Sequence, residues 1–185
     1  MALGIHIFKT LHEAAKEGDL KRIDVLLQKK NFNVDAEDEC QTTPLFYAAR
    51  HGHTEVVKQL LAAGADPDRP TPRGDTPLFQ AAQEGHTAIV KILLAAGVKP
   101  TRYNKKGSTP FLVAVHRGHT EIVKVLLDKG EPVDEPNPHG WTALFAAVEK
   151  GHLAIARDLI ARGAEVNRGA KDGITPTPVR TAPST

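Results

Sequence analysis

The sequence has almost no cysteine and few aromatic residues. Its single cysteine, Cys40, excludes an intramolecular disulfide framework and a zinc site made of four thiolates. Aromatic residues make up 5% of the chain, so the core has to be aliphatic and rich in alanine. No run approaches the roughly 18 apolar residues that a membrane span needs. Residues 1–8 are too short, and too poor in positive charge, for a secretory signal.

Charge of one sign is not in excess either. The chain has 24 basic and 22 acidic residues and a net charge of +2, so there is no bulk field to indicate binding to nucleic acid or to an anionic membrane. Hydrophobic residues make up 41% and charged residues 25%, which argues against wholesale disorder. The length of 185 residues suits one domain.

Residues suited to catalysis are scarce. The only serines are Ser108 and Ser184. Cys40 and His51 could form a nucleophile and base pair if both faced one groove, but a loop cysteine beside a solvated histidine explains them better. No glycine-rich phosphate loop is present, since the glycines come one per turn. We expect no enzymatic activity and no cofactor.

Most glycines recur with a period of 33 residues, and five threonines share this period. Gly18 precedes the first periodic glycine by 34 residues, which indicates one extra residue between the first two units. A fixed period of this length is typical of stacked repeats. The recurring residues are Gly52, Gly85, Gly118 and Gly151; Gly64, Gly97, Gly130 and Gly163; Gly74, Gly107, Gly140 and Gly173; and Thr43, Thr76, Thr109, Thr142 and Thr175.

Residues 43–75 show how one unit should fold. Thr43 can cap a helix whose first residue is Pro44, where the missing N–H costs nothing. Gly52 is placed to end that helix in a left-handed conformation. A second helix should follow and end at Gly64, and its buried stripe is predicted at Val56, Val57, Leu60 and Leu61. Neither helix is long enough to be stable alone, so the units must stack on one another.

The sequence resembles the ankyrin repeat family. The resemblance rests on Thr-Pro-Leu or Thr-Pro-Phe triplets, Gly-His pairs, Leu-Leu pairs and Gly-Ala pairs, which begin at Thr43, Thr76 and Thr109; Gly52, Gly85, Gly118 and Gly151; Leu60, Leu93 and Leu126; and Gly64 and Gly163. It implies an all-α repeat solenoid, an ankyrin-like stack of helix-turn-helix units joined by long β-turn loops. We expect repeats at about 9–42, 43–75, 76–108, 109–141 and 142–174, an N-terminal extension at 1–8 and a Thr/Pro-rich tail at 175–185.

Two departures from the family pattern carry predictions. The histidine that often follows the triplet is replaced by Phe46, Phe79, Leu112 and Phe145, which predicts an apolar contact between repeats in place of a polar one. The first unit lacks Thr-Pro and is interpreted as an N-terminal cap, with Thr10 and Glu13 at capping-box spacing. A sixth unit starts at Thr175 and then breaks off. The outer face of the last repeat would then be exposed, unless the tail covers it or the chain is cut from a longer parent.

Nine histidines raise the question of a metal site. Four of them recur once per repeat, about 10 Å apart for packed helices, whereas zinc ligands lie about 2 Å from one ion. We therefore expect these turn histidines to bond backbone, and we expect no metal. His116 and His119 are separated by Gly118, which should end their helix. The paired carboxylates Asp134 and Glu135 lie on a proline-rich loop, where we expect them to be solvated.

The family resemblance implies that a partner protein binds on the concave face, formed by the turn tips and the first helix of each repeat. Recognition residues there should be those that do not recur, and Trp, Tyr and Arg are the types that dominate interface energetics. Basic residues concentrate at the third and fourth tips, next to Trp141. The candidates are Arg50, His51, Arg73, Asp75, Tyr103, Lys105, Lys106, His116, Arg117, His139, Trp141 and Lys150.

These residues predict a non-catalytic module for protein–protein interaction that takes an acidic segment with an apolar anchor. The competing interpretation is that they are ordinary solvated tips, with Trp141 packed on its neighbouring loop. Another alternative is an interaction domain cut from a longer regulatory or enzymatic protein. Nucleic-acid binding through Arg73, Lys105, Lys106 and Arg117 is disfavoured by the near-neutral charge. We expect a cytoplasmic monomer, from the missing signals and from the habit of the family.

Overall fold

The computed structural model describes residues 11–29 and 32–167. Helices alternate with loops throughout these ranges, and no strand occurs in them. A helical segment at residues 11–17 precedes α2 (Leu20–Leu27), α3 (Pro44–His51), α4 (Thr54–Ala62), α5 (Pro77–Glu84), α6 (Thr87–Ala95), α7 (Pro110–Arg117), α8 (Thr120–Asp128), α9 (Ala143–Glu149) and α10 (Leu153–Ala161).

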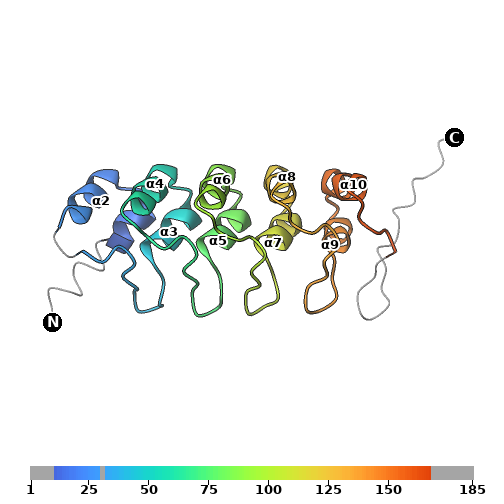
Figure 1. Cartoon of the computed structure of the whole chain (residues 1–185), viewed down its shortest axis with the longest axis horizontal. Coiled ribbons are helices and arrows are strands. Elements are labelled where there is room, and N and C mark those ends of the chain that lie inside the picture. Colours follow the sequence, from blue (N-terminus) through green and yellow to red (C-terminus); the bar gives the residue numbers. More distant parts are fainter. Residues whose placement is uncertain (1–10, 30–31, 168–185) are drawn as a thin grey trace.

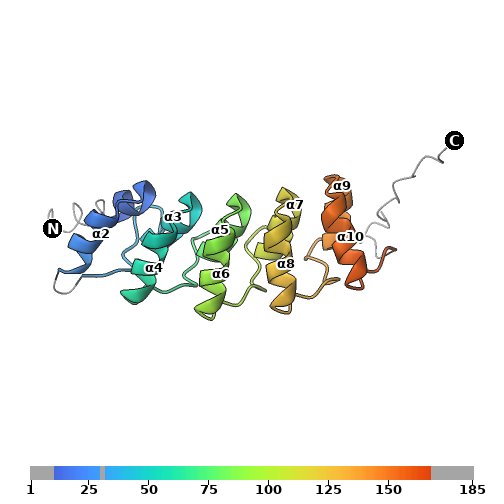
Figure 2. The same cartoon turned by 90° about the horizontal axis from the view of Figure 1, so that it is seen from above.

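The helices form an elongated stack of antiparallel pairs in chain order (Figure 1). Helices α3, α5, α7 and α9 make one layer, and α2, α4, α6, α8 and α10 make the other (Figures 1 and 2). The loops between pairs all project on the same side, beyond the layer of first helices (Figure 1). This arrangement confirms the expected all-α repeat solenoid.

Helix starts and ends follow the predicted chemistry. The side chain of Thr43 accepts a hydrogen bond from the backbone N–H of Phe46, and three later threonines cap α5, α7 and α9 in the same way. Proline occupies the first turn of α3, α5 and α7. Gly52 caps the end of α3 with φ of +80°, a left-handed conformation that favours glycine. The tight turn between paired helices therefore has the geometry that the sequence predicts.

The core is aliphatic and runs the length of the stack. Leu45, Ala48 and Ala49 of α3 are fully buried, and their small size lets neighbouring helices approach closely. On α4, Val56, Val57 and Leu60 are buried as predicted, but Leu61 is only partly buried. The prediction for Leu61 was therefore too strong, because the stripe is narrower than four residues on this short helix.

The four histidines of the Gly-His pairs connect consecutive repeats. His53 Nε2 lies 2.9 Å from the carbonyl oxygen of Lys16, and the histidines at 86, 119 and 152 make the equivalent contact at 3.0–3.1 Å with the carbonyls of residues 50, 83 and 116. Each acceptor lies two residues before the glycine of the preceding repeat. The prediction that these turn histidines bond backbone is confirmed. We call this series the histidine ladder.

A fifth histidine, which the sequence analysis passed over, keeps the polar contact at the start of the stack. His12 is buried, and its Nε2 lies 2.9 Å from the carbonyl oxygen of Thr42. It precedes Ala14 by two residues, as Phe46 precedes Ala48. Phe46 and Phe79 are buried at this place in later repeats, in agreement with the predicted apolar replacement.

Some expectations fall on residues that the structure does not describe. They are the N-terminal extension, Thr10 of the capping box, and the chain from residue 168 on, which includes Thr175 and the tail. Within the described part, α2 begins with a different cap, because Asp19 accepts a hydrogen bond from the backbone N–H of Arg22 at 3.0 Å.

Candidate functional site

A groove of about 1320 Å³ lies between the layer of first helices and the projecting loops. Residues from α3, α5, α7 and α9 form one wall and the loop tips form the other. We use "the groove" for the surface lined by Cys40, Thr42, Phe46, Tyr47, Arg50, Thr71, Pro72, Arg73, Asp75, Phe79, Gln80, Gln83, Asn104, Lys105, Lys106, Ser108, Leu112, Val113, His116, Arg117, Asn137, Trp141, Thr142, Ala146, Glu149 and Lys150.

Nine of the twelve candidate residues line the groove, and three lie outside it. The His51 ring stacks beside His53, with ring centroids 6.3 Å apart. The His139 ring lies against Gly107 of the preceding loop. Tyr103 lines a separate small pocket between two loops. The nine in the groove are Arg50, Arg73, Asp75, Lys105, Lys106, His116, Arg117, Trp141 and Lys150. A binding role for all twelve stays a prediction.

The groove carries most of the positive charge of the molecule. Six lysine or arginine residues line it against two carboxylates, Asp75 and Glu149, whereas the whole chain has a net charge of only +2. Asp75 accepts a hydrogen bond from Asn104 at 2.7 Å, and Glu149 lies 3.5 Å from Lys150. In the described ranges, none of the other five basic side chains forms an ion pair. The positive charge is therefore available to a ligand.

The electrostatic field of the groove also acts on His116. Burial lowers the pKa of His116, and the nearby charges of Lys150 and Arg117 lower it further. The imidazole is therefore neutral at physiological pH, and it offers a donor or an acceptor without adding to the positive charge.

Trp141 is the largest apolar group at the groove. Its ring meets the Phe145 ring edge-on, with centroids 4.5 Å apart and planes at 87°, and 37% of the residue stays exposed. Its backbone N–H donates to Asn137 Oδ1 at 3.0 Å, which holds the loop in place. The alternative that Trp141 packs on a neighbouring loop is wrong, since its ring partner lies in the first turn of α9, in the same repeat. The ring is thus fixed and still accessible.

The sequence analysis missed a row of groove residues on the first helices. Tyr47, Gln80, Val113 and Ala146 stand 33 residues apart, at one position of α3, α5, α7 and α9, and all four line the groove. A signal was available, because this helix position varies between repeats while its neighbours recur. The analysis looked for variable residues only before the Gly-His pairs and at the loop tips.

Tyr47 belongs to a polar cluster at the N-terminal end of the groove. Its hydroxyl donates to Asp38 Oδ2 at 2.8 Å, and the Lys16 ammonium lies 3.9 Å from the ring centroid. Burial and the Asp38 hydrogen bond raise the pKa of Tyr47 to about 12. Burial alone would raise the pKa of Asp38, but hydrogen bonds from Tyr47 and from the backbone N–H groups of Thr42 and Cys40 lower it. This end of the groove is therefore pre-organised.

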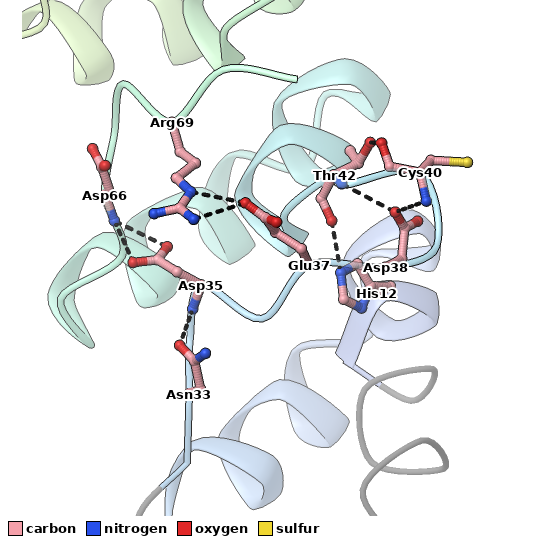
Figure 3. A network of polar contacts seen from close by, with 9 residues as sticks. All are labelled: His12, Asn33, Asp35, Glu37, Asp38, Cys40, Thr42, Asp66 and Arg69. Atoms are coloured by element: carbon pink, nitrogen blue, oxygen red, sulfur yellow. Dashed lines mark hydrogen bonds and ion pairs between the residues drawn. The ribbon is translucent and has the colours of Figure 1, made fainter. Parts of the chain in front are cut away.

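Figure 3 shows how the loop that contains Asp38 is fixed. Asp38 Oδ1 accepts hydrogen bonds from the backbone N–H groups of Cys40 and Thr42. The exposed Cys40 points its sulfur away from this network. In the described chain neither a hydrogen bond nor a ring contact joins Cys40 to His51. The nucleophile and base pair that we weighed therefore gains no support.

The same view shows how this loop is joined to the next one. Both oxygens of Asp35 accept from the backbone N–H of Asp66, and Arg69 forms an ion pair with Glu37 at 2.8 Å (Figure 3). Asp134 and the backbone N–H of Glu165 repeat the first of these contacts at 2.8 Å, at the far end of the stack. Adjacent loops are thus connected directly, which keeps the loop wall of the groove in register with the helices.

Other kinds of site find no support in the described ranges. No three histidine, cysteine or acidic residues come together there to hold a metal ion. None of the helices described combines the length and the hydrophobicity that a membrane crossing requires.

Comparison with known proteins identifies the fold family. A family model described as "Ankyrin repeats (3 copies)" matches residues 11–104 and 96–170, which together span most of the chain. The chain belongs to the ankyrin repeat family. Ankyrin repeats generally mediate protein–protein interaction.

Curated ankyrin proteins are similar over shorter stretches. Human ankyrin repeat domain-containing protein 7 is 45% identical over 53 residues, 29% of this chain and 21% of that protein. A Caenorhabditis elegans homolog of transient receptor potential cation channel subfamily A member 1 is 38% identical over 65 residues, 35% of this chain and 5% of the channel. Bovine ankyrin repeat domain-containing protein 49 is 41% identical over 58 residues, 31% of this chain and 24% of that protein. The matched segments thus cover no more than a quarter of these relatives.

Proposed function

We propose that this ankyrin domain is a non-catalytic interaction module whose groove binds an acidic segment of a partner protein with one apolar side chain as its anchor. The observation that carries the proposal is the concentration of six basic side chains in the groove of a nearly neutral chain. Complementary charge steers association and suppresses wrong partners. An acidic segment is therefore the ligand that this surface favours.

Trp141 supports the second half of the proposal. A rigid aromatic ring that is partly exposed and held edge-on by Phe145 can bury a leucine-sized side chain at little cost in entropy. Arg117 and Lys150 line the same part of the groove. An apolar anchor flanked by carboxylates would satisfy these groups together.

The test uses the single tryptophan as the reporter. The probe is a short acidic peptide with one central leucine, and its effect on the fluorescence of Trp141 is measured. One control peptide has alanine in place of leucine, and another has lysine in place of every acidic residue. We expect saturable binding of the first peptide, weaker binding of the second and none of the third. Equal binding of all three peptides would contradict the proposal.

Variants then locate the site. Charge reversal at Arg117 and Lys106, both to Glu, should abolish binding of the acidic peptide and leave the circular dichroism spectrum unchanged. Lys124→Glu is the matched control, because Lys124 is exposed on α8, in the second layer and outside the groove. If Lys124→Glu weakens binding as much as the groove variants do, the site lies elsewhere. A pulldown from source lysate with the wild type and the groove variant would then seek the natural partner.

As a second candidate, we propose that the domain acts as part of a longer regulatory or enzymatic protein. Ile160 of α10 is 47% exposed, whereas Leu127, at the same repeat position of α8, is 8% exposed. An apolar residue at this place is one that a following unit would cover. Sedimentation tests this: self-association that Ile160→Lys abolishes would support an uncovered end. A wild-type protein that stays monomeric at all concentrations would argue against it.

The remaining expectations belong to the proposal. They are the repeat boundaries within residues 9–174, the flanking segments at 1–8 and 175–185, a monomeric state, a cytoplasmic location and the lack of enzymatic activity. Repeat proteins of this kind act through surfaces rather than enclosed pockets. An activity assay is therefore secondary to the binding experiments above.

A further inference from the structure

A second, smaller hollow of about 40 Å³ lies outside the groove, between the loop that precedes α7 and the loop that follows α8. We call it the loop pocket. It shares only Leu112 with the groove lining, so it is a separate surface. Its lining consists of Thr101, Tyr103, Thr109, Phe111, Leu112, Glu131, Pro132 and Glu135.

Glu131 stands at a position that other repeats give to a small apolar residue. The residue that directly follows the glycine after the second helix is Ala65, Val98 or Ala164 elsewhere, and each of these is buried. Glu131 is buried as well, with 8% of the residue exposed, and its Oε1 atom has no hydrogen-bond partner in the described structure. A buried carboxylate without a partner is costly, so its presence here calls for a ligand or a proton.

The surroundings of Glu131 are acidic and contain no base. Glu135 lies at the exposed rim, on the same loop, and Tyr103 forms the opposite rim. No lysine, arginine or histidine lines the loop pocket, and neither carboxylate forms an ion pair in the described ranges. A cation entering the pocket would therefore meet two carboxylates that no protein group neutralises.

We propose that the loop pocket binds a primary ammonium group, with Glu131 and Glu135 as counter-charges and Tyr103 as an aromatic wall. An ammonium has three donors, and the pocket offers the carboxylates of both glutamates and the Thr101 hydroxyl as acceptors. The face of a tyrosine ring also attracts a cation. The volume exceeds the 10–15 Å³ or so that one water needs, and an ammonium head is of similar size.

A hard divalent cation suits the loop pocket less well. Calcium takes about six to eight oxygen ligands, and magnesium needs near-octahedral oxygen coordination. Much of the lining is carbon, from Phe111, Leu112 and Pro132. The site therefore has too few oxygens for such ions, while its apolar wall suits the methylene stem that carries a lysine ammonium.

Ionisation of Glu131 should couple to binding. Burial, and to a lesser degree the Glu135 charge, raises the pKa of Glu131 to about 7. The other titratable group that faces it is Tyr103, whose pKa is raised by burial and by the two carboxylates. The rest of the lining does not titrate in this range. Because the ammonium binds the ionised carboxylate, binding should be about tenfold weaker at pH 6 than at pH 8.

The test follows the carboxyl carbon of Glu131 and the amide of Tyr103 by NMR in the full chain. The probe is n-butylammonium chloride, with sodium chloride and calcium chloride at matched ionic strength as controls. We expect saturation by the amine alone, with a dissociation constant on the order of millimolar and the pH dependence given above. Saturation by calcium and not by the amine would overturn the proposal, and so would the lack of any saturable shift.

Variants and a second probe complete the experiment. Glu131→Gln should abolish the response of the Tyr103 amide, Glu135→Gln should weaken it, and the exposed control Glu165→Gln should leave it unchanged. An unchanged response in Glu131→Gln would refute the assignment. A peptide with one lysine, compared with its acetylated form, distinguishes the source of the ammonium: tighter binding than butylammonium indicates a protein lysine, and weaker binding indicates a free amine. None of these measurements depends on the groove.

Discussion

Replacing Glu131 by glutamine should stabilise the domain at pH 8 and have a much smaller effect at pH 4.5. The carboxyl is buried, and burial raises its pKa from 4.5 to about 7. Glutamine keeps the shape of the side chain and cannot ionise. Any cost of burying its amide does not depend on pH, so the pH-dependent part of the change isolates the charge.

The sign and size of the effect follow from the two pKa values. The unfolded chain loses this proton near pH 4.5 and the folded chain near pH 7, so between these values the folded state holds a proton that the unfolded state has released. The free energy of unfolding of the wild type therefore falls as pH rises from 4.5 to 7, and is then level. The pKa difference corresponds to about 3 kcal/mol, a large part of the 5–15 kcal/mol typical of a folded domain.

Urea denaturation followed by circular dichroism checks this prediction. At pH 8 the midpoint of Glu131→Gln should exceed that of the wild type by about 1 M or more, and at pH 4.5 the difference should be much smaller. Glu165→Gln, on the next loop and exposed, serves as the control and should show no such pH dependence. A difference of the same size at both pH values would refute the reasoning that the buried charge is costly.

Three further predictions concern the stack itself. Gly85 and Gly97 both have positive φ, +85° and +88°, but a Cβ at Gly85 would lie 2.8 Å from His119 Cε1 while one at Gly97 meets nothing within 4 Å; alanine at Gly97 should cost about 1–2 kcal/mol of unfolding free energy and alanine at Gly85 more, and equal losses would show that the ladder contact is unimportant. Thr109→Ala removes the cap of α7 and should cost about 1 kcal/mol in urea denaturation, so an unchanged midpoint would contradict the cap. Arg69→Ala breaks an ion pair at the surface and should change stability by less than about 1 kcal/mol, with a larger, salt-independent loss as the contrary result.

The features that recur every 33 residues could be predicted from the sequence. Thr43 and Gly52 declare the ends of α3 by their chemistry, and the histidine ladder follows from the same period. These residues act through the backbone of their own or the adjacent repeat, so their local pattern is sufficient to predict their contacts.

Single departures from the pattern were harder to interpret. Glu131 differs from Ala65, Val98 and Ala164, and this was visible in the sequence, but its burial depends on how two loops pack against α7. The edge-on contact of Trp141 with Phe145 depends on side-chain rotamers, which a period does not specify. Tyr47 was missed for a third reason, since the groove reaches further along the first helices than the predicted face.

The histidine ladder makes the stack a ruler. Three of its carbonyl acceptors belong to Arg50, Gln83 and His116, which also line the groove. The interval between equivalent groove positions is therefore tied to the interval between helices, about 8–10 Å, while an extended peptide advances about 3.3–3.6 Å per residue. An extended ligand would meet the same position of the next repeat at about every third residue, and inserting one residue into it would place every later side chain out of phase.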